Sequence, residues 1–196
     1  MRHLVIGAGA VGGLLAARLA RAGREVVGVA RGAHLEALRT RGLTLRTPAG
    51  TEHVALDAVA CIEDAAPQPS DVFLLTVKAQ DVEALLPGIP EGATVVCFQN
   101  GVSTEPRVAT RTDRVIGAMT WTPAVHIVAG LVEVFAHAPT GVFRVGDYPE
   151  GAAAAAEQVA VVLSELGFDA AAVPDVMAWK HGKLLTNLAN VLDAGA

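Results

Sequence analysis

The sequence predicts an α/β fold built on a doubly wound, mostly parallel sheet, and three observations carry this prediction. Short apolar runs alternate with helix-compatible segments along the 196 residues. The first run, at about residues 2–6, leads directly into a G-x-G-x-x-G pattern at residues 7–12. Apolar runs at residues 72–77 and 94–98 are typical of buried parallel strands. Together these features indicate a Rossmann-type dinucleotide-binding domain.

Glycine and proline mark the ends of the expected helices. Glycine ends three of them, because it adopts the left-handed conformation at little cost: residues 10–22 before Gly23, residues 33–41 before Gly42 and residues 151–166 before Gly167. Proline bounds two more: residues 79–86 before Pro87, and a last helix from Pro174 to about Ala194.

Further strands are expected between these helices, at about residues 25–29, 43–45, 53–55, 115–119, 131–136 and 141–145. A Thr-Pro-Ala-Gly-Thr turn joins the segments 43–45 and 53–55, which predicts a hairpin-like excursion. The segments 131–136 and 141–145 alternate apolar and polar residues like antiparallel strands.

Composition excludes several classes of partner. The net charge is −5 and no basic cluster is present, so neither nucleic acid nor an anionic membrane is an expected partner. No apolar run reaches the roughly 18 residues of a membrane span, and the first residues do not have the layout of a signal peptide. We expect Cys61 and Cys97 to be reduced, buried thiols of a cytoplasmic protein, with no metal site.

The glycine pattern predicts where a dinucleotide binds. Gly7 allows the tight turn, Gly9 lets a pyrophosphate approach the backbone, and Gly12 lets the helix pack against the strand. The phosphates then lie at the helix N-terminus, where free N–H groups and the helix dipole favour anions. The predicted cofactor loop consists of Gly7, Ala8, Gly9, Ala10, Val11 and Gly12.

The end of the second strand indicates which nicotinamide cofactor binds. NAD sites carry an Asp or Glu there, which binds the ribose hydroxyls. Here the strand ends Val29-Ala30-Arg31-Gly32, without an acid. The Arg31 guanidinium suits a 2′-phosphate, so we expect NADPH rather than NADH. A plain surface charge at Arg31 is the alternative.

Two polar residues follow the ends of neighbouring predicted strands. Lys78 ends the run at residues 72–77, and Asn100 follows the run at residues 94–98. Ligands collect at the carboxyl ends of strands in open α/β sheets, so we expect both side chains to face the cofactor crevice. The alternatives are an exposed loop lysine and an ordinary Asn-Gly turn.

The last helix carries a polar stripe. Lys183, Asn187 and Asn190 fall within about 60° of one another on a helix, and leucines cover another side. One ammonium and two amides could protonate and orient a polar substrate. On spacing alone, the solvated face of an ordinary amphipathic helix is the simpler interpretation.

Taken together, these pieces resemble the ketopantoate reductase (2-dehydropantoate 2-reductase) family. The resemblance covers nearly the whole chain and rests on an ordered set of motifs: Gly7-Ala-Gly-Ala-Val-Gly-Gly13, Arg31 followed by His34-Leu-x-Ala-Leu and Gly42-Leu43, Asp71-Val-Phe-Leu-Leu-Thr-Val-Lys78, Gln99-Asn-Gly101, and Trp179 before Lys183-Leu-Leu-Thr-Asn187.

The resemblance implies NADPH-dependent reduction of a 2-keto acid, most plainly 2-dehydropantoate to pantoate for coenzyme A synthesis. It implies Lys183 as general acid, Asn187 and Asn190 as substrate-binding amides, Asn100 at both substrate and cofactor, and Lys78 near the cofactor. In the family pattern the second amide follows the first by four residues, whereas Asn190 follows by three. A related oxidoreductase on another keto acid or an imine therefore remains an alternative. A non-catalytic NADPH-binding module or sensor is a further alternative, because these residues lack the second wall of the cleft that the family's helical domain supplies.

The resemblance also implies two domains. Residues 1–172 correspond to the dinucleotide-binding domain and residues 173–196 to the start of a helical C-terminal domain that is truncated here. That domain supplies a Ser and a Glu to the site in the family, and this chain offers no candidate for either. An uncovered face with Leu184, Leu185, Leu188 and Leu192 would be a liability, so we expect a homodimer that covers it.

Overall fold

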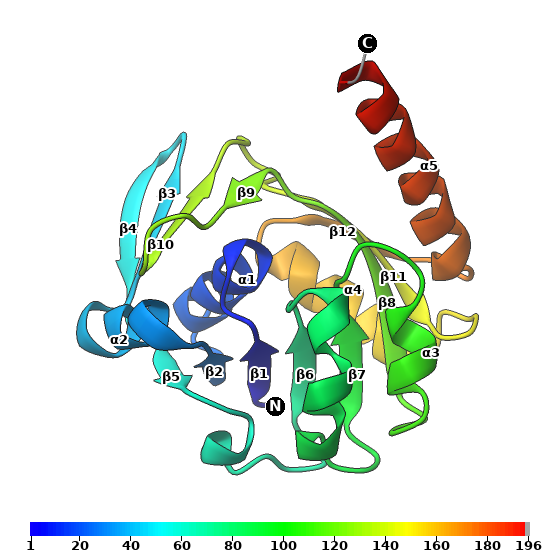
Figure 1. Cartoon of the computed structure of the whole chain (residues 1–196), viewed down its shortest axis with the longest axis horizontal. Coiled ribbons are helices and arrows are strands. Elements are labelled where there is room, and N and C mark those ends of the chain that lie inside the picture. Colours follow the sequence, from blue (N-terminus) through cyan, green and yellow to red (C-terminus); the bar gives the residue numbers. More distant parts are fainter. Residues whose placement is uncertain (195–196) are drawn as a thin grey trace.

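The computed structural model describes the backbone of residues 1–194 and the side chains of residues 1–188. A central eight-stranded sheet carries helices on both faces, a four-stranded sheet stands beside it, and α5 (Val176–Ala194) projects from the layered body (Figure 1). The fold is the predicted α/β fold with a doubly wound, mostly parallel sheet of the Rossmann type.

The large sheet has the strand order β12-β11-β8-β7-β6-β1-β2-β5. Neighbouring strands are parallel except for β8 and β11, which are antiparallel. The strand bounds are β1 (His3–Ile6), β2 (Val26–Val29), β5 (Asp57–Val59), β6 (Val72–Leu75), β7 (Thr94–Cys97), β8 (Val115–Trp121), β11 (Val142–Asp147) and β12 (Asp169–Ala172).

The central strands are apolar throughout because both of their faces are buried. In β1, Val5 joins a core with α1 (Ala10–Arg21) and α4 (Ala154–Glu165). Leu4 and Ile6 point to the opposite face, where the 3-10 segment η3 (Glu83–Gly88) and α3 (Thr104–Val108) cover the sheet. Side chains alternate across a strand, so an unbroken apolar run fills two cores at once.

The structure corrects the prediction of a helix at residues 79–86. Two 3-10 segments, η2 (Ala79–Asp81) and η3, occupy this stretch, and Pro87 lies inside the second. Proline has no N–H to donate, which explains why no regular α-helix forms here. The other helices are confirmed, with α2 at Gly32–Arg41 and α4 beginning a few residues later than expected.

The smaller sheet has the order β4-β3-β10-β9. Its bounds are β3 (Leu43–Thr47), β4 (Gly50–Val54), β9 (Ala124–Val125) and β10 (Leu131–Val134), and β3 and β4 form the predicted hairpin. The two segments whose alternation is typical of antiparallel strands belong to different sheets, and each has one antiparallel neighbour. β11 is antiparallel to β8, whereas β10 is parallel to β3 and antiparallel to β9.

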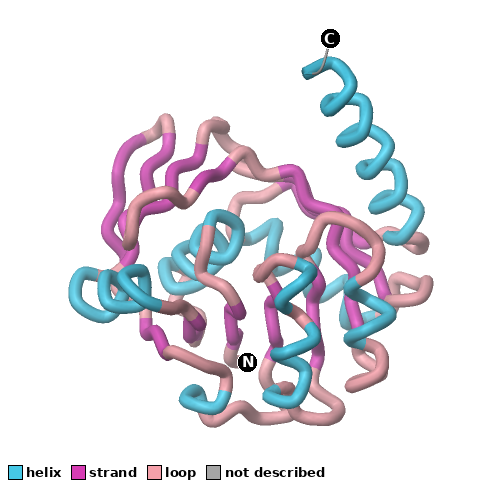
Figure 2. The backbone as a smooth tube through the Cα atoms, viewed as in Figure 1, coloured by secondary structure: helices cyan, strands magenta, loops and turns pink. Residues whose placement is uncertain are grey.

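α5 is buried only at its start. Val176 and Lys180 are 0% and 2% exposed, whereas Leu185 and Leu188 are 70% and 61% exposed. Figure 2 shows the rest of this helix extending away from the sheets. The uncovered leucine face is therefore confirmed for these two positions, and the side chain of Leu192 lies outside the described residues.

Two further expectations concern cysteines and membranes. Cys97 is buried, but Cys61 is exposed, because it lies in a bend after β5 rather than within a strand. The prediction that Cys61 is buried is therefore wrong. Within the part of the chain that the structure covers, no helix combines the length and apolar character that crossing a membrane requires.

Candidate active site

The loop between β1 and α1 is shaped by Gly7 and Gly12. Gly7 has φ +102°, a left-handed backbone that other residues rarely adopt. A Cβ at Gly12 would lie 2.2 Å from the Gly7 carbonyl oxygen and 2.4 Å from Thr76 Oγ1. Thr76 Oγ1 itself donates hydrogen bonds to the carbonyls of Ile6 (3.1 Å) and Gly7 (2.8 Å), which ties the loop to β6. Turn and close packing thus require glycine at both positions.

Gly9 differs from these two glycines. A Cβ at this position would meet no protein atom within 4 Å. Gly9 is also the N-cap of α1, and no side chain caps this helix end. A pyrophosphate requires open space above the backbone and free N–H groups to bind. Gly9 provides the space, and the first turn of α1 provides the N–H groups. The loop therefore fits the diphosphate of a dinucleotide.

A cleft of about 430 Å³ opens in front of this loop, and we call it the glycine-loop cleft. Its lining includes residues that follow three neighbouring strands: Gly7–Ala10 after β1, Arg31 and His34 after β2, and Lys78 and Asp81 after β6. Because β1 lies between β2 and β6, the cleft is at the switch point of the sheet, where ligands of open α/β folds bind. Arg31 is exposed and is the N-cap of α2.

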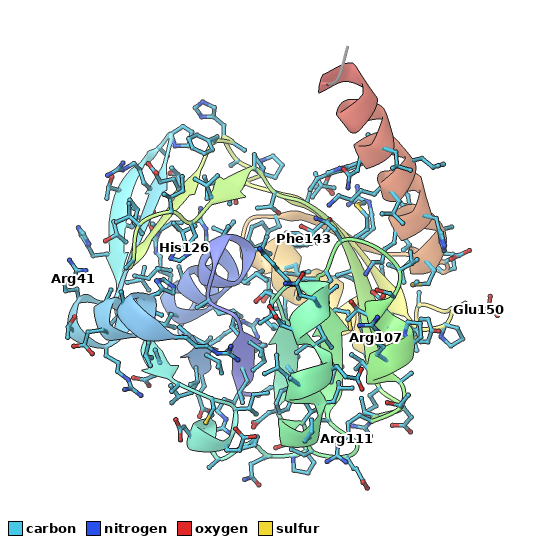
Figure 3. The ribbon with its side chains drawn as sticks, viewed as in Figure 1. Arg41, Arg107, Arg111, His126, Phe143 and Glu150 are labelled. Atoms are coloured by element: carbon cyan, nitrogen blue, oxygen red, sulfur yellow. The ribbon has the colours of Figure 1, made fainter. Side chains whose placement is uncertain are left out.

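Two histidines join this loop to the smaller sheet. His34 Nε2 donates to the carbonyl of Ala8 at 2.7 Å, so Nδ1 is left as an acceptor. It accepts from the N–H of Gly130 and from Nε2 of His126, each at 3.0 Å (Figure 3 labels His126). Burial, followed by the neighbouring His34, lowers the pKa of His126.

A second, much narrower pocket of about 10 Å³ lies where α5 meets the ends of β7 and β8, and we call it the lysine pocket. Lys183 Nζ donates to Asn100 Oδ1 at 2.6 Å and to the carbonyl of Thr120. Burial, followed by the positive charge of Lys180, lowers the pKa of Lys183 below its ordinary value of 10.5. An ammonium so placed releases its proton more readily than a solvated lysine does.

Gln99 connects the two regions. Its Nε2 donates to the carbonyls of Leu75 (2.9 Å) and Val77 (3.1 Å), at the end of the strand that leads to Lys78. Gln99 Oε1 is buried and makes no hydrogen bond among the described residues. The following Asn100-Gly101 pair turns sharply, with φ +90° at Gly101, and presents Asn100 to Lys183.

The structure thus divides the predicted site residues between two places. Gly7–Ala10, Arg31 and Lys78 line the glycine-loop cleft, whereas Val11 and Gly12 belong to the first turn of α1. Asn100, Lys183 and Asn187 line the lysine pocket. The side chain of Asn190 lies outside the described residues.

Sequence reasoning missed several polar residues that hold these groups in place: Thr76, Gln99, His126, Glu105 and Lys180. Thr76 and Gln99 stand inside motifs already quoted, and Lys180 lies one turn before Lys183, so spacing could have signalled these three. His126 and Glu105 carry no local signal, because only the tertiary fold brings them to the site. Among the residues with described side chains, no cluster of three metal-ligating groups is found.

Comparisons with known proteins agree with this geometry. The family model of ketopantoate reductase PanE/ApbA matches residues 3–150. The 2-dehydropantoate 2-reductase of Archaeoglobus fulgidus is 36% identical over 190 residues, which cover 96% of this chain and 61% of that protein. The crystal structure of 2-dehydropantoate 2-reductase from Methylococcus capsulatus has a TM-score of 0.82 at 25% identity, over 95% of this chain and 61% of that chain.

A further structural neighbour has a cofactor in its site. D-mandelate dehydrogenase in complex with NADH has a TM-score of 0.77 at 23% identity, over 92% of this chain and 58% of that chain. At this identity the likeness concerns the fold.

A parallel sheet with a glycine-rich crossover and a cleft at its switch point defines a Rossmann-type α/β protein. Within that class, the chain belongs to the ketopantoate reductase PanE/ApbA family. It spans about three-fifths of the length of the curated relatives that it matches.

Proposed function

We propose that this chain carries the cofactor site and the general acid of an NADPH-dependent 2-keto acid reductase, with 2-dehydropantoate as substrate and pantoate as product. One observation carries the proposal: the Lys183 ammonium is half-buried between Asn100 Oδ1 and a strand-end carbonyl, beside a cleft suited to a dinucleotide. The family name, ketopantoate reductase, indicates 2-dehydropantoate (ketopantoate) as the substrate.

The cofactor choice rests on Arg31. Its guanidinium lies at the cleft after β2, where NAD-specific sites place an acid. The acid of this cleft, Asp81, follows β6 instead and so does not take that place. These positions favour NADPH, whereas the NADH complex of D-mandelate dehydrogenase is the reason to compare both nucleotides.

In the proposed reaction, NADPH held by the glycine loop and Arg31 would supply the hydride for the keto carbon, and the carbonyl electron pair would move to oxygen. Lys183 Nζ donates its proton to that oxygen, which completes the hydroxyl. Its positive charge stabilises the developing alkoxide before the proton moves. Asn100 and the Thr120 carbonyl hold the ammonium in place, and the Asn187 amide lies in the same pocket to bind the polar substrate.

The direct test mixes the purified chain with NADPH and 2-dehydropantoate and follows loss of the reduced-nicotinamide absorbance. Substrate-dependent oxidation of NADPH with formation of pantoate is the expected result. A panel of other keto acids and imines identifies a different substrate, should one be preferred. Tight NADPH binding without turnover on any member of the panel would overturn the proposal.

That negative outcome defines the second candidate function, a non-catalytic NADPH-binding module. The two candidates share the glycine-loop cleft and differ only in the use of Lys183.

We further propose that residues 1–172 are the dinucleotide-binding domain and that α5 begins a second unit, which a second copy of the chain covers. Leu185 and Leu188 present an apolar face beyond the buried start of α5. Light scattering at micromolar concentration should give a dimer, and Leu188→Glu should give a monomer. A monomeric wild-type chain would contradict this.

We also propose that the protein is located in the reducing cytoplasm, because its two cysteines are unpaired thiols.

A further inference from the structure

A buried ion pair lies directly behind the lysine pocket. Lys180 Nζ donates to Glu105 Oε1, and the two residues are 2% and 0% exposed. Lys180 belongs to α5 and Glu105 to α3, so the pair joins two helices that are far apart in the sequence. Lys180 is three residues before Lys183, which places the two ammonium groups on neighbouring turns of one helix face.

Stability alone does not account for this pair. Desolvation of two charges offsets most of their attraction, and apolar side chains of similar volume generally stabilise a protein as well or better. Glu105 Oε2 is buried and makes no hydrogen bond among the described residues, which adds to the cost. Because burial of this ion pair costs free energy, we infer that its role concerns the neighbouring Lys183.

We propose that Glu105 and Lys180 are a positioning pair for Lys183: Glu105 fixes the start of α5 through Lys180, and the fixed charge of Lys180 acts on the Lys183 ammonium. The inference rests on the proposed function only for the use of Lys183 as an acid. The contacts themselves are independent of that use.

Close packing supports the anchoring role. A Cβ at Gly117 in β8 would lie 2.8 Å from Val176 Cγ1 and 3.5 Å from Glu105 Oε1. Glycine at this position therefore lets the first turn of α5 rest against β8. The same strand carries Thr120, whose carbonyl accepts a hydrogen bond from Lys183. The ion pair and this strand thus fix Lys183 from two sides.

The charges around Lys183 support the electrostatic role. Its polar partners Asn100 and Thr120 are neutral. Charged groups around the start of α5 include Lys180, Glu105 and Arg144 of β11, whose guanidinium lies over the Trp179 ring, and Cys97 of β7 is close to the ion pair. Burial raises the pKa of the Cys97 thiol, so it stays neutral. Burial first and the charge of Lys180 second lower the pKa of Lys183, which makes Lys180 the cation that acts on it.

The test removes both charges and reads Lys183 directly. In the double variant K180M/E105Q the side chains keep similar volumes. NMR of isotopically labelled lysine, with the Lys183 signal assigned from Lys183→Arg, gives the Lys183 titration without any need for turnover. We expect the midpoint to move to higher pH by about half a unit, because loss of the Glu105 charge offsets part of the effect of losing the Lys180 charge, which acts on Lys183 more strongly. Arg107→Gln, which removes an exposed charge from α3 (Figure 3), should leave the midpoint unchanged.

Kinetics adds a second readout if the chain turns over keto acid. A general acid must be protonated, so kcat falls as pH rises through the pKa of Lys183, and this fall should move to higher pH in the double variant. An unchanged Lys183 midpoint in a folded double variant would overturn the positioning pair, whereas a shifted midpoint without turnover would overturn only the proposed function. Should K180M/E105Q fail to fold, K180Q/E105Q gives the same test with a neutral, hydrogen-bonding amide pair.

Discussion

The glycine-loop cleft and the lysine pocket are neighbours built in opposite ways. The cleft is made by consecutive residues, and its binding groups are backbone N–H groups beside glycines. The lysine pocket is made by three segments far apart in the sequence, where the Asn100 side chain and the Thr120 backbone carbonyl accept hydrogen bonds from Lys183 of α5. A local motif thus serves binding, and a tertiary network serves the proposed proton transfer.

This difference has a physical cause. A diphosphate is held by N–H groups whose positions follow from one turn, so glycine spacing is enough to specify it. A general acid needs a lowered pKa and a fixed direction, which only burial and several partners provide. Substitutions in the glycine-loop cleft should therefore weaken nucleotide binding, whereas substitutions in the lysine pocket should lower the rate of turnover.

The largest expected effect is that of Lys183→Ala. Loss of a general acid lowers kcat by about 10²- to 10⁴-fold. The NADPH dissociation constant should stay within a factor of about two, because Lys183 lies in the lysine pocket and not in the glycine-loop cleft. Stopped-flow turnover and nucleotide titration measure the two quantities. An equally large decrease in kcat and in NADPH affinity would show that the glycine-loop cleft and the lysine pocket do not act independently.

The pair Gly12→Ala and Gly9→Ala sharpens the comparison within the loop. The first places a methyl group 2.2 Å from the Gly7 carbonyl and should lower the free energy of unfolding by about 3 kcal/mol. The second meets no protein atom and should change stability by less than about 1 kcal/mol, yet it should weaken NADPH binding. Denaturant unfolding and nucleotide titration test both. Unchanged nucleotide affinity in a folded Gly9→Ala variant would show that the pyrophosphate does not bind at this loop.

A smaller effect is expected from Arg31→Ala. Loss of a charge-assisted contact to a phosphate costs about 1.5–3 kcal/mol, so NADPH affinity should fall by roughly 10- to 100-fold. NADH affinity should change little, since NADH lacks the 2′-phosphate. Arg39→Ala, an exposed arginine on α2 outside the cleft lining, is the matched control. Parallel weakening of both nucleotides would argue against a 2′-phosphate contact.

The sequence predicts the local parts of this molecule well. Glycine spacing, strand order along the chain and helix ends follow from short-range sterics, and the doubly wound sheet agrees with them. One exception, the helix expected at residues 79–86, has a local cause in Pro87, and the others have tertiary causes. β10 pairs with β3 across a long separation, and residues 169–172, a run of Asp and Ala with low strand propensity, form β12 because β11 offers its edge.

The candidate site follows the same division. The loop of residues 7–12 and the positions of Arg31 and Lys78 can be expected from their places at strand ends. The place of Asn100 after a strand can be expected in the same way, but the hydrogen bonds from Lys183 to Asn100 and Thr120 cannot, because they form only after α5 docks on β8. Glu105 is the extreme case, an isolated acid whose role appears only when Lys180 is seen beside it.

The most direct measurement is calorimetric titration of the unmodified chain with NADPH and with NADH under identical conditions. If the loop after β1 holds a diphosphate and Arg31 binds the additional phosphate, one equivalent of NADPH should bind at least about tenfold more tightly than NADH. A chain that binds neither reduced nucleotide would contradict the proposed cofactor site and, with it, the proposed reduction.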